Sequence, residues 1–131
     1  MERIDQKLDQ LIKESFSASF MNNTKWLKLV ERLTDAFDNP YVDYKLVTSS
    51  KIDNCFLFND YYNWFYEPIL FKEVEWVCFP KECEIIHGRR ITRKIKKNYT
   101  QDIDQIEQII LEIGQFILEK TDDYLKVYAY R

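Results

Sequence analysis

The stretch from Trp64 to Pro80, WFYEPILFKEVEWVCFP, constrains the fold of this chain more than any other segment. Its second half, Val74 to Phe79, is rich in the β-branched and aromatic residues that favour strands. Pro80 ends the run because proline has no N–H to donate to a ladder. We expect a central strand here, with its residues alternating between two sides: Val74, Trp76 and Cys78 on one, Glu73, Glu75, Val77 and Phe79 on the other.

Hydrophobic periodicity predicts three helices in the rest of the chain. The first covers Met1 to Glu14. The second begins at a cap formed by Asn23 or Thr24 and runs to about Phe37, with Asp38-Asn39-Pro40 as its stop. The third covers Gln101 to Lys120, with Thr100 as its cap.

Three further strands are expected around the central one. Tyr41 to Thr48 alternates as a half-exposed strand, and Cys55 to Phe58 is a short apolar run predicted to be buried on both faces. Tyr124 to Tyr130 predicts a terminal strand at an edge, with a tyrosine-rich exposed side. Strand and helix runs are segregated, so we predict an α+β fold, an antiparallel or mixed sheet of about four strands packed against two to three helices.

The length of 131 residues fits one domain. We expect residues 1–21 to form an N-terminal helical arm and residues 22–131 to form a single α+β domain. The narrow apolar stripe of the first helix leaves two options open, loose docking on the domain or a dimer through this helix.

Several classes of protein are excluded by composition. Only Gly88 and Gly114 are present, so no glycine-rich phosphate loop of the P-loop or Rossmann kind can form. The three cysteines include no CxxC pair, which favours reduced thiols in a cytoplasmic protein. No apolar run approaches the length of a membrane span, and we expect no membrane association and no cofactor.

Charge is distributed unevenly along the chain. The net charge is −3, yet residues 85–100 carry six basic residues and no acid. One interpretation is phosphate contact; the other is a solvated segment that balances the acids on either side. The acidic chain and the lack of aromatics between residues 89 and 97 favour the second. A nucleic-acid-binding module therefore stays the alternative function, with its phosphate-binding residues being Arg89, Arg90, Arg93, Lys94, Lys96 and Lys97.

No arrangement of residues points to catalysis or to a metal. His87 is the single histidine, and the sequence places no nucleophile or orienting acid beside it. Cys78, Cys83 and His87 lack the paired spacing of a zinc site. Glu73 and Glu75 would project from the same face of a strand, a spacing typical of solvated acids as well as of glycosidase pairs. We therefore expect a protein that is not an enzyme and holds no metal.

Acidic and aromatic residues instead suggest a surface that binds a protein. Aromatic side chains anchor such surfaces, and charges steer the encounter. The predicted partner-binding residues are Asp43, Asp60, Tyr61, Tyr62, Glu67, Glu73 and Glu75.

The helix start NNTKWLKLVERL, the following YVDYKLV and the later WFYEP and FKEVEWVCFP resemble a family of small bacterial domains of unknown function. The resemblance covers Asn22 to Phe79 and lies in an Asn-Thr-Lys-Trp helix start and a Glu-Trp strand. In size, acidity and lack of catalytic signatures the chain is also similar in style to the immunity proteins of bacterial toxin systems. We expect a non-enzymatic bacterial interaction protein, with toxin neutralisation as its suggested role.

Overall fold

The computed structural model describes residues 2–37, 40–57, 71–87 and 95–131. The elements are α1 (Glu2–Ser15), α2 (Asn23–Ala36), β1 (Tyr41–Leu46), β2 (Ile52–Phe56), the short 3-10 helix η1 (Phe71–Glu73), β3 (Val74–Pro80), β4 (Glu82–His87), β5 (Ile95–Thr100), α3 (Ile103–Ile113), β6 (Ile117–Lys120) and β7 (Tyr124–Tyr128). The fold is α+β, as predicted. No helix in this part of the chain is both long and apolar enough to span a bilayer.

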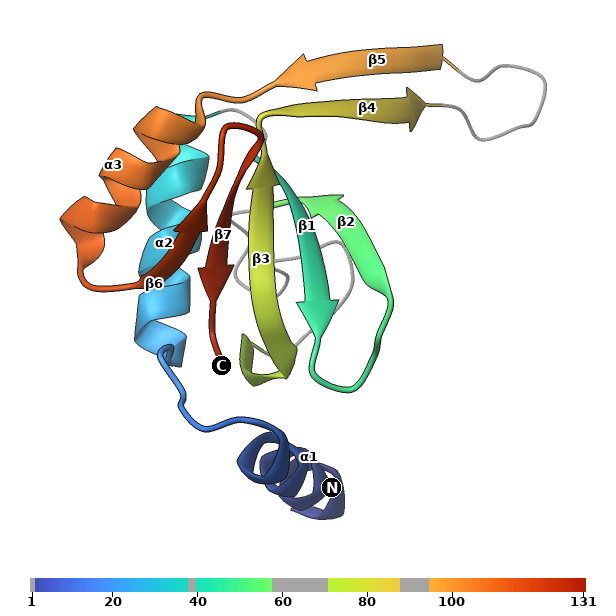
Figure 1. The fold of residues 1–131 in the computed structure, drawn as a ribbon, viewed down its shortest axis with the longest axis vertical. Helices are drawn as coiled ribbons and strands as arrows, with labels where there is room; N and C mark the ends of the chain where they lie inside the picture. Colours follow the sequence, from blue (N-terminus) through green and yellow to red (C-terminus); the bar gives the residue numbers. More distant parts are fainter. Residues whose placement is uncertain (1, 38–39, 58–70, 88–94) are drawn as a thin grey trace.

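One antiparallel sheet of five strands, in the order β2-β1-β3-β7-β6, forms the body of the molecule (Figure 1). The predicted central strand is confirmed, because β3 lies in the middle of this order. The sheet has five strands rather than about four. The predicted edge position of the last strand is wrong, since β7 pairs with β3 on one side and β6 on the other.

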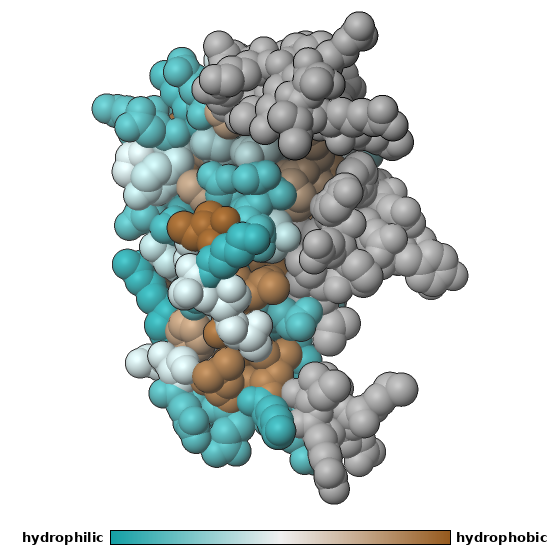
Figure 2. Space-filling model, turned by 90° about the vertical axis from the view of Figure 1, so that its right-hand side faces the viewer, coloured by the Kyte–Doolittle hydropathy of each residue, from teal (hydrophilic) through white to brown (hydrophobic). Residues whose placement is uncertain are grey.

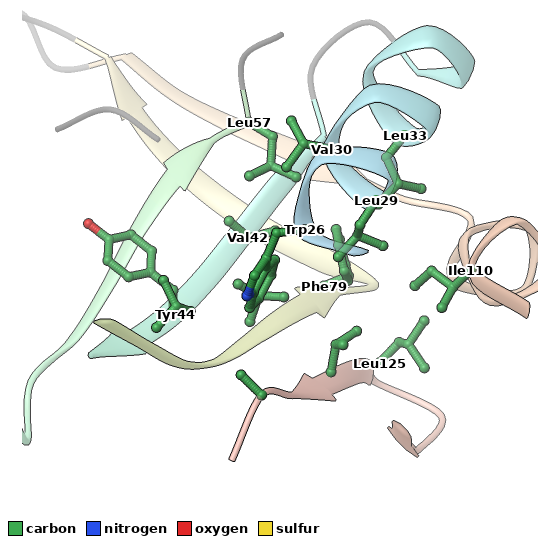
Figure 3. Close-up of a cluster of buried hydrophobic side chains, with 14 of the residues drawn as sticks. Trp26, Leu29, Val30, Leu33, Val42, Tyr44, Leu57, Phe79, Ile110 and Leu125 are labelled. Atoms are coloured by element: carbon green, nitrogen blue, oxygen red, sulfur yellow. The ribbon is translucent and has the colours of Figure 1, made fainter. Parts of the chain in front are cut away.

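Helices α2 and α3 lie on one side of the sheet and enclose the hydrophobic core (Figure 1). Figure 3 shows how α2 contributes Trp26, Leu29, Val30 and Leu33 to this core. These four residues are the buried face of the helix, and they meet Val42, Phe79 and Leu125 from the sheet. Burying each large apolar side chain contributes about 1.5–3 kcal/mol, so packing of this stripe fixes α2 on the sheet.

The caps of two helices differ by one or two residues from the prediction. Asn22, not Asn23 or Thr24, caps α2, because its side chain accepts a hydrogen bond from Lys25 N at 2.8 Å. Asp102, not Thr100, caps α3 by accepting from Gln105 N at 3.1 Å. In both sequences several neighbouring side chains can cap, and the tertiary position of the first turn selects among them.

The helix predicted over residues 101–120 ends early. It stops at Ile113, with Gly114 at its C-terminal cap, and residues 117–120 form strand β6. The apolar periodicity runs across Gly114, which hid the change of structure. Residues 117–120 are a strand because they pair with β7, and each hydrogen bond to β7 stabilises the extended conformation.

Strand β2 also departs from its prediction. It begins at Ile52, three residues before the predicted start at Cys55, and among the described strands it pairs with β1 alone. Cys55 and Leu57 are buried, but Phe56 between them is only partly buried, so the expectation of burial on both faces is wrong. An edge strand has one open side, and only alternate residues of β2 reach the core. Phe58 lies outside the described residues.

A β-bulge in β3 breaks the predicted alternation. Lys45 pairs with Trp76 and the next residue, Leu46, pairs with Val74, which leaves Glu75 as the extra residue. Val74 therefore joins Val77 and Phe79 in the core, instead of sharing a side with Trp76 and Cys78. Trp76 and Cys78 are each 8% exposed and lie outside the main core cluster.

Residues 82–87 and 95–100 form two strands that the sequence did not predict. Strands β4 and β5 pair only with each other, as a hairpin that extends away from the sheet (Figure 1). Gln101 ties its base to the sheet. The Gln101 amide accepts from Tyr41 N at 2.8 Å and donates to Tyr41 O at 3.0 Å and Pro80 O at 2.9 Å.

The chain before α2 is joined to the C-terminus. Ser17 N and Ala18 N donate to Arg131 O, Phe20 N donates to Ala129 O, and Ser19 forms an isolated bridge with Tyr130. The Phe16 and Tyr130 rings stack with centroids 5.3 Å apart. Helix α1 precedes these contacts in the chain, and its Leu8 is buried at 6% exposure.

Candidate functional site

The structure describes three of the seven predicted partner-binding residues. Asp43 and Glu75 lie in strands β1 and β3. Glu73 ends η1, outside the strand, so the predicted same-face spacing of Glu73 and Glu75 along a strand is wrong. The other four lie outside the described residues: Asp60, Tyr61, Tyr62 and Glu67.

The side of the sheet that is turned away from α2 and α3 carries cross-strand rows of polar and aromatic residues. We call this side the open face, because none of the described helices lies over it (Figure 1). Its positions alternate with the core residues of each strand. One row, named the Cys78 row, runs across the sheet as Asn54, Asp43, Cys78, Lys126 and Glu119. The neighbouring Trp76 row is Ile52, Lys45, Trp76, Tyr128 and Ile117.

Lys126 and Trp76 form the centre of the open face. The Lys126 ammonium lies 4.2 Å from the Trp76 ring centroid, and 5.7 Å and 5.6 Å from those of Tyr124 and Tyr128. A cation over an aromatic face contributes about 0.5–1 kcal/mol when exposed and about 2 kcal/mol when desolvated. The lysine chain thereby covers the indole, which explains how Trp76 is 8% exposed on a face that none of the described helices covers.

The bulge at Glu75 places a charged pair beside this centre. Lys45 Nζ lies 2.7 Å from Glu75 Oε1 and also donates to Leu46 O at 3.1 Å. Both side chains are largely covered, at 23% and 18% exposure. A pair this sheltered is less screened than a surface salt bridge, so it holds the bulge in one geometry.

Asp43 lies where burial disfavours its charge. Burial raises the pKa of the Asp43 carboxyl above its usual range. Burial, then the nearby Asp43 carboxylate, raises the pKa of Tyr41 to about 12. Burial, again followed by Asp43, raises the pKa of Cys78 to about 11 and raises that of Cys83. The raised pKa values of Tyr41 and Cys78 keep these two open-face groups protonated at neutral pH, so neither is a ready nucleophile.

Aromatic contacts continue toward the edges of the open face. Tyr124 donates to Glu119 at 2.9 Å, and the Arg131 guanidinium lies 4.7 Å from the Tyr128 ring centroid. At the other edge Tyr41 and Phe56 meet edge to face at 5.6 Å. Figure 2, which views the side where β2 lies, shows apolar residues interspersed with hydrophilic ones.

The described open face has charges of both signs. Asp43, Glu75 and Glu119 are its acids, and Lys45 and Lys126 are its bases. Since Glu75 is neutralised by Lys45, the surface is mixed rather than acidic. A mixed, aromatic surface suits a partner that itself carries both signs.

The other predicted sites are described only in part. Lys96 and Lys97 lie in β5, opposite Ile86 and Ile85 of β4, but only their backbone is described. The remaining phosphate-binding residues of the alternative function, Arg89, Arg90, Arg93 and Lys94, lie outside the described residues. Within the described ranges no three His, Cys, Asp or Glu side chains gather as metal ligands.

Sequence reasoning missed Lys126, Trp76 and Tyr128 as members of the site. The alternation of tyrosine and lysine from Tyr124 to Tyr128 was the available signal, because it marks one side of a strand as polar and aromatic. The bulge at Glu75 left no comparable signal and concealed the side to which Trp76 belongs.

Comparison with known proteins places the chain in a family. Residues 8–131 match a family of unknown function (DUF6678), and the chain belongs to that family. No curated protein matches, and neither does any solved structure. The predicted likeness to a family of small domains of unknown function is thereby confirmed.

Proposed function

We propose that this member of the DUF6678 family is a non-enzymatic protein-binding domain that holds its partner on the open face. The observation that carries the proposal is the Lys126 cluster. Three aromatic rings, contributed by β3 and β7, surround one lysine on a side of the sheet that no described helix covers. Aromatic residues with flanking charges are the composition of binding hot spots.

A protein suits this surface better than a nucleic acid does. A phosphate backbone is bound by surfaces dominated by lysine and arginine. The open face places Asp43, Glu75 and Glu119 among its bases, and these acids would repel phosphates. The Trp76 ring is also covered by Lys126, so it offers no platform on which a base stacks.

Within this class we propose the narrower role of a bacterial toxin-immunity protein acting in the cytoplasm. Its support is the small acidic chain with net charge −3 and the protonated state of the one open-face thiol, Cys78, which leaves binding as the simplest use of the site. Such a protein acts by covering its target, for which a rigid sheet face with aromatic anchors is well suited.

Affinity capture from the native host tests the proposal. The wild-type chain, Lys126→Glu and the control Glu112→Lys are immobilised, and the bound proteins are compared by mass spectrometry. Glu112 is an apt control because it lies on α3, is 54% exposed and, within the described residues, forms its ion pair with Arg32 of α2. We expect a protein retained by the wild type and the control but lost with Lys126→Glu. Equal capture by all three would refute the open face as the binding site.

A further inference from the structure

We infer that the open face binds a second copy of this chain, in a two-fold dimer whose axis runs along β3. The inference rests on the proposed function in using the same open face for protein binding, and it assigns this face a second occupant, another copy of the chain. A two-fold interface uses one patch twice, so the patch must complement itself. The rows of the open face meet this condition because β3 is the middle strand, with two strands on each side.

The Cys78 row supplies the charge complementarity. Rotation by 180° about an axis along β3 keeps each row at its own level and lays β1 of one copy over β7 of the other. Asp43 and Lys126 occupy matching places on β1 and β7, since both pair with Cys78. Each Asp43 therefore faces the Lys126 of the other copy, and the contact occurs twice. Asn54 and Glu119 face each other in the same way at the outer strands.

The Trp76 row supplies the apolar complementarity. Lys45 and Tyr128 both pair with Trp76, so a lysine of one copy faces a tyrosine ring of the other. Ile52 and Ile117, on the outer strands, also face each other. This contact covers Ile52, which is 57% exposed in the single chain.

Charges already present decide the direction of the axis. An axis across the strands, between the rows, would bring Asp43 over Lys45 of the other copy. Lys45 is held by Glu75 at 2.7 Å, so that arrangement would divide one lysine between two carboxylates. Asp43 and Lys126 form no ion pair with another residue in the described part of the chain. The axis along β3 gives each of them a partner of opposite sign.

The size of the face sets the strength of the dimer. Five strands about 4.8 Å apart and about 17 Å long present roughly 400 Å² per copy, or about 800 Å² in total. Stable interfaces bury about 1,200–2,000 Å², so the dimer is weak, and a heterologous partner can displace the second copy. We expect dissociation constants between about 10 µM and 1 mM.

Sedimentation equilibrium over about 10 µM to 1 mM chain tests the inference on the wild type and four variants. Asp43→Lys and Lys126→Glu each replace two attractive contacts by two repulsive ones, and each should raise the dissociation constant at least about tenfold. The double variant Asp43→Lys, Lys126→Glu restores opposite charges across the axis and should return to within about threefold of the wild type. Glu112→Lys, an equal charge change on α3, should leave it unchanged.

Thermal melting of each variant shows that it is folded, and Asp43→Asn serves as the milder substitution if a reversal unfolds the chain. A wild type that stays monomeric at 1 mM overturns the inference, and so does a double variant no better than the single ones. A monomeric wild type leaves the proposed function standing if host capture still depends on Lys126. If the dimer forms but host capture does not depend on Lys126, the proposed function is refuted and the dimer is not.

Discussion

Replacing Gln101 tests whether a single side chain joins the hairpin to the sheet. Its amide makes three hydrogen bonds, accepting from Tyr41 N at 2.8 Å and donating to Tyr41 O at 3.0 Å and to Pro80 O at 2.9 Å. These bonds take the place of ladder bonds between the start of β1 and the end of β3. Each of these hydrogen bonds contributes about 0.5–1.5 kcal/mol, and their loss leaves partly buried backbone groups unpaired. Gln101→Ala should therefore lower the free energy of unfolding by about 2–4 kcal/mol.

Urea unfolding gives the free energy, and hydrogen exchange at the Tyr41 amide gives the local effect. We expect this amide to exchange faster in Gln101→Ala. At neutral pH Gln101→Glu should be at least as unstable as Gln101→Ala. Its carboxylate can accept a hydrogen bond from Tyr41 N but cannot donate one to either carbonyl. Gln108→Ala, at an exposed position of α3, is the matched control. A loss below about 0.5 kcal/mol in Gln101→Ala, equal to that of the control, would refute the reasoning.

Three further outcomes are expected. Asn22→Ala should lower the free energy of unfolding in urea by about 0.5–2 kcal/mol, because the Asn22 side chain accepts the capping hydrogen bond from Lys25 N. Thr24→Ala should lower it by less, and the reverse order would contradict the assigned cap. Iodoacetamide at pH 8 should label Cys83, which is half-buried, before Cys78, whose pKa is about 11, and peptide mass spectrometry showing Cys78 labelled first would contradict its burial. Asp43→Asn should raise the melting temperature at neutral pH. Because burial raises the pKa of Asp43, the folded state favours the protonated form, so the difference from the wild type should vanish as the pH falls below the ordinary value of 3.8; a difference independent of pH would exclude this cause.

The fold was predictable where local pattern and tertiary environment agree. The apolar stripe of Trp26, Leu29, Val30 and Leu33 specified α2 and its buried face, and the residues of β3 specified a central strand. Both signals are periodic over several residues, and periodicity survives small errors in the boundaries. The hairpin of β4 and β5 was not predicted, because its strands pair only with each other and contain a run of charges.

The candidate site was less predictable than the fold, because it depends on strand register and on the bulge at Glu75. Asp43 and Glu75 were identified as charged surface residues, but their neighbours depend on pairing between distant strands. One extra residue at the bulge moves Val74 into the core and leaves Trp76 on the open face. A single sequence records neither the register nor the bulge, so the Lys126 cluster follows only from the paired strands.

The bulge also connects the open face to the segment before α2. The Glu75 carbonyl accepts from Ala129 N at 2.8 Å and Tyr130 N at 3.4 Å, just beyond the end of β7. Tyr130 in turn stacks on Phe16 and donates to Lys72 O at 2.9 Å, and the Ser19 bridge joins the same residue. The side chain of Glu75 meets Lys45 on the open face, while its carbonyl anchors the segment on which α1 depends. Because one residue makes both sets of contacts, we expect a change in the geometry of the bulge to alter the open face and the segment before α2 together.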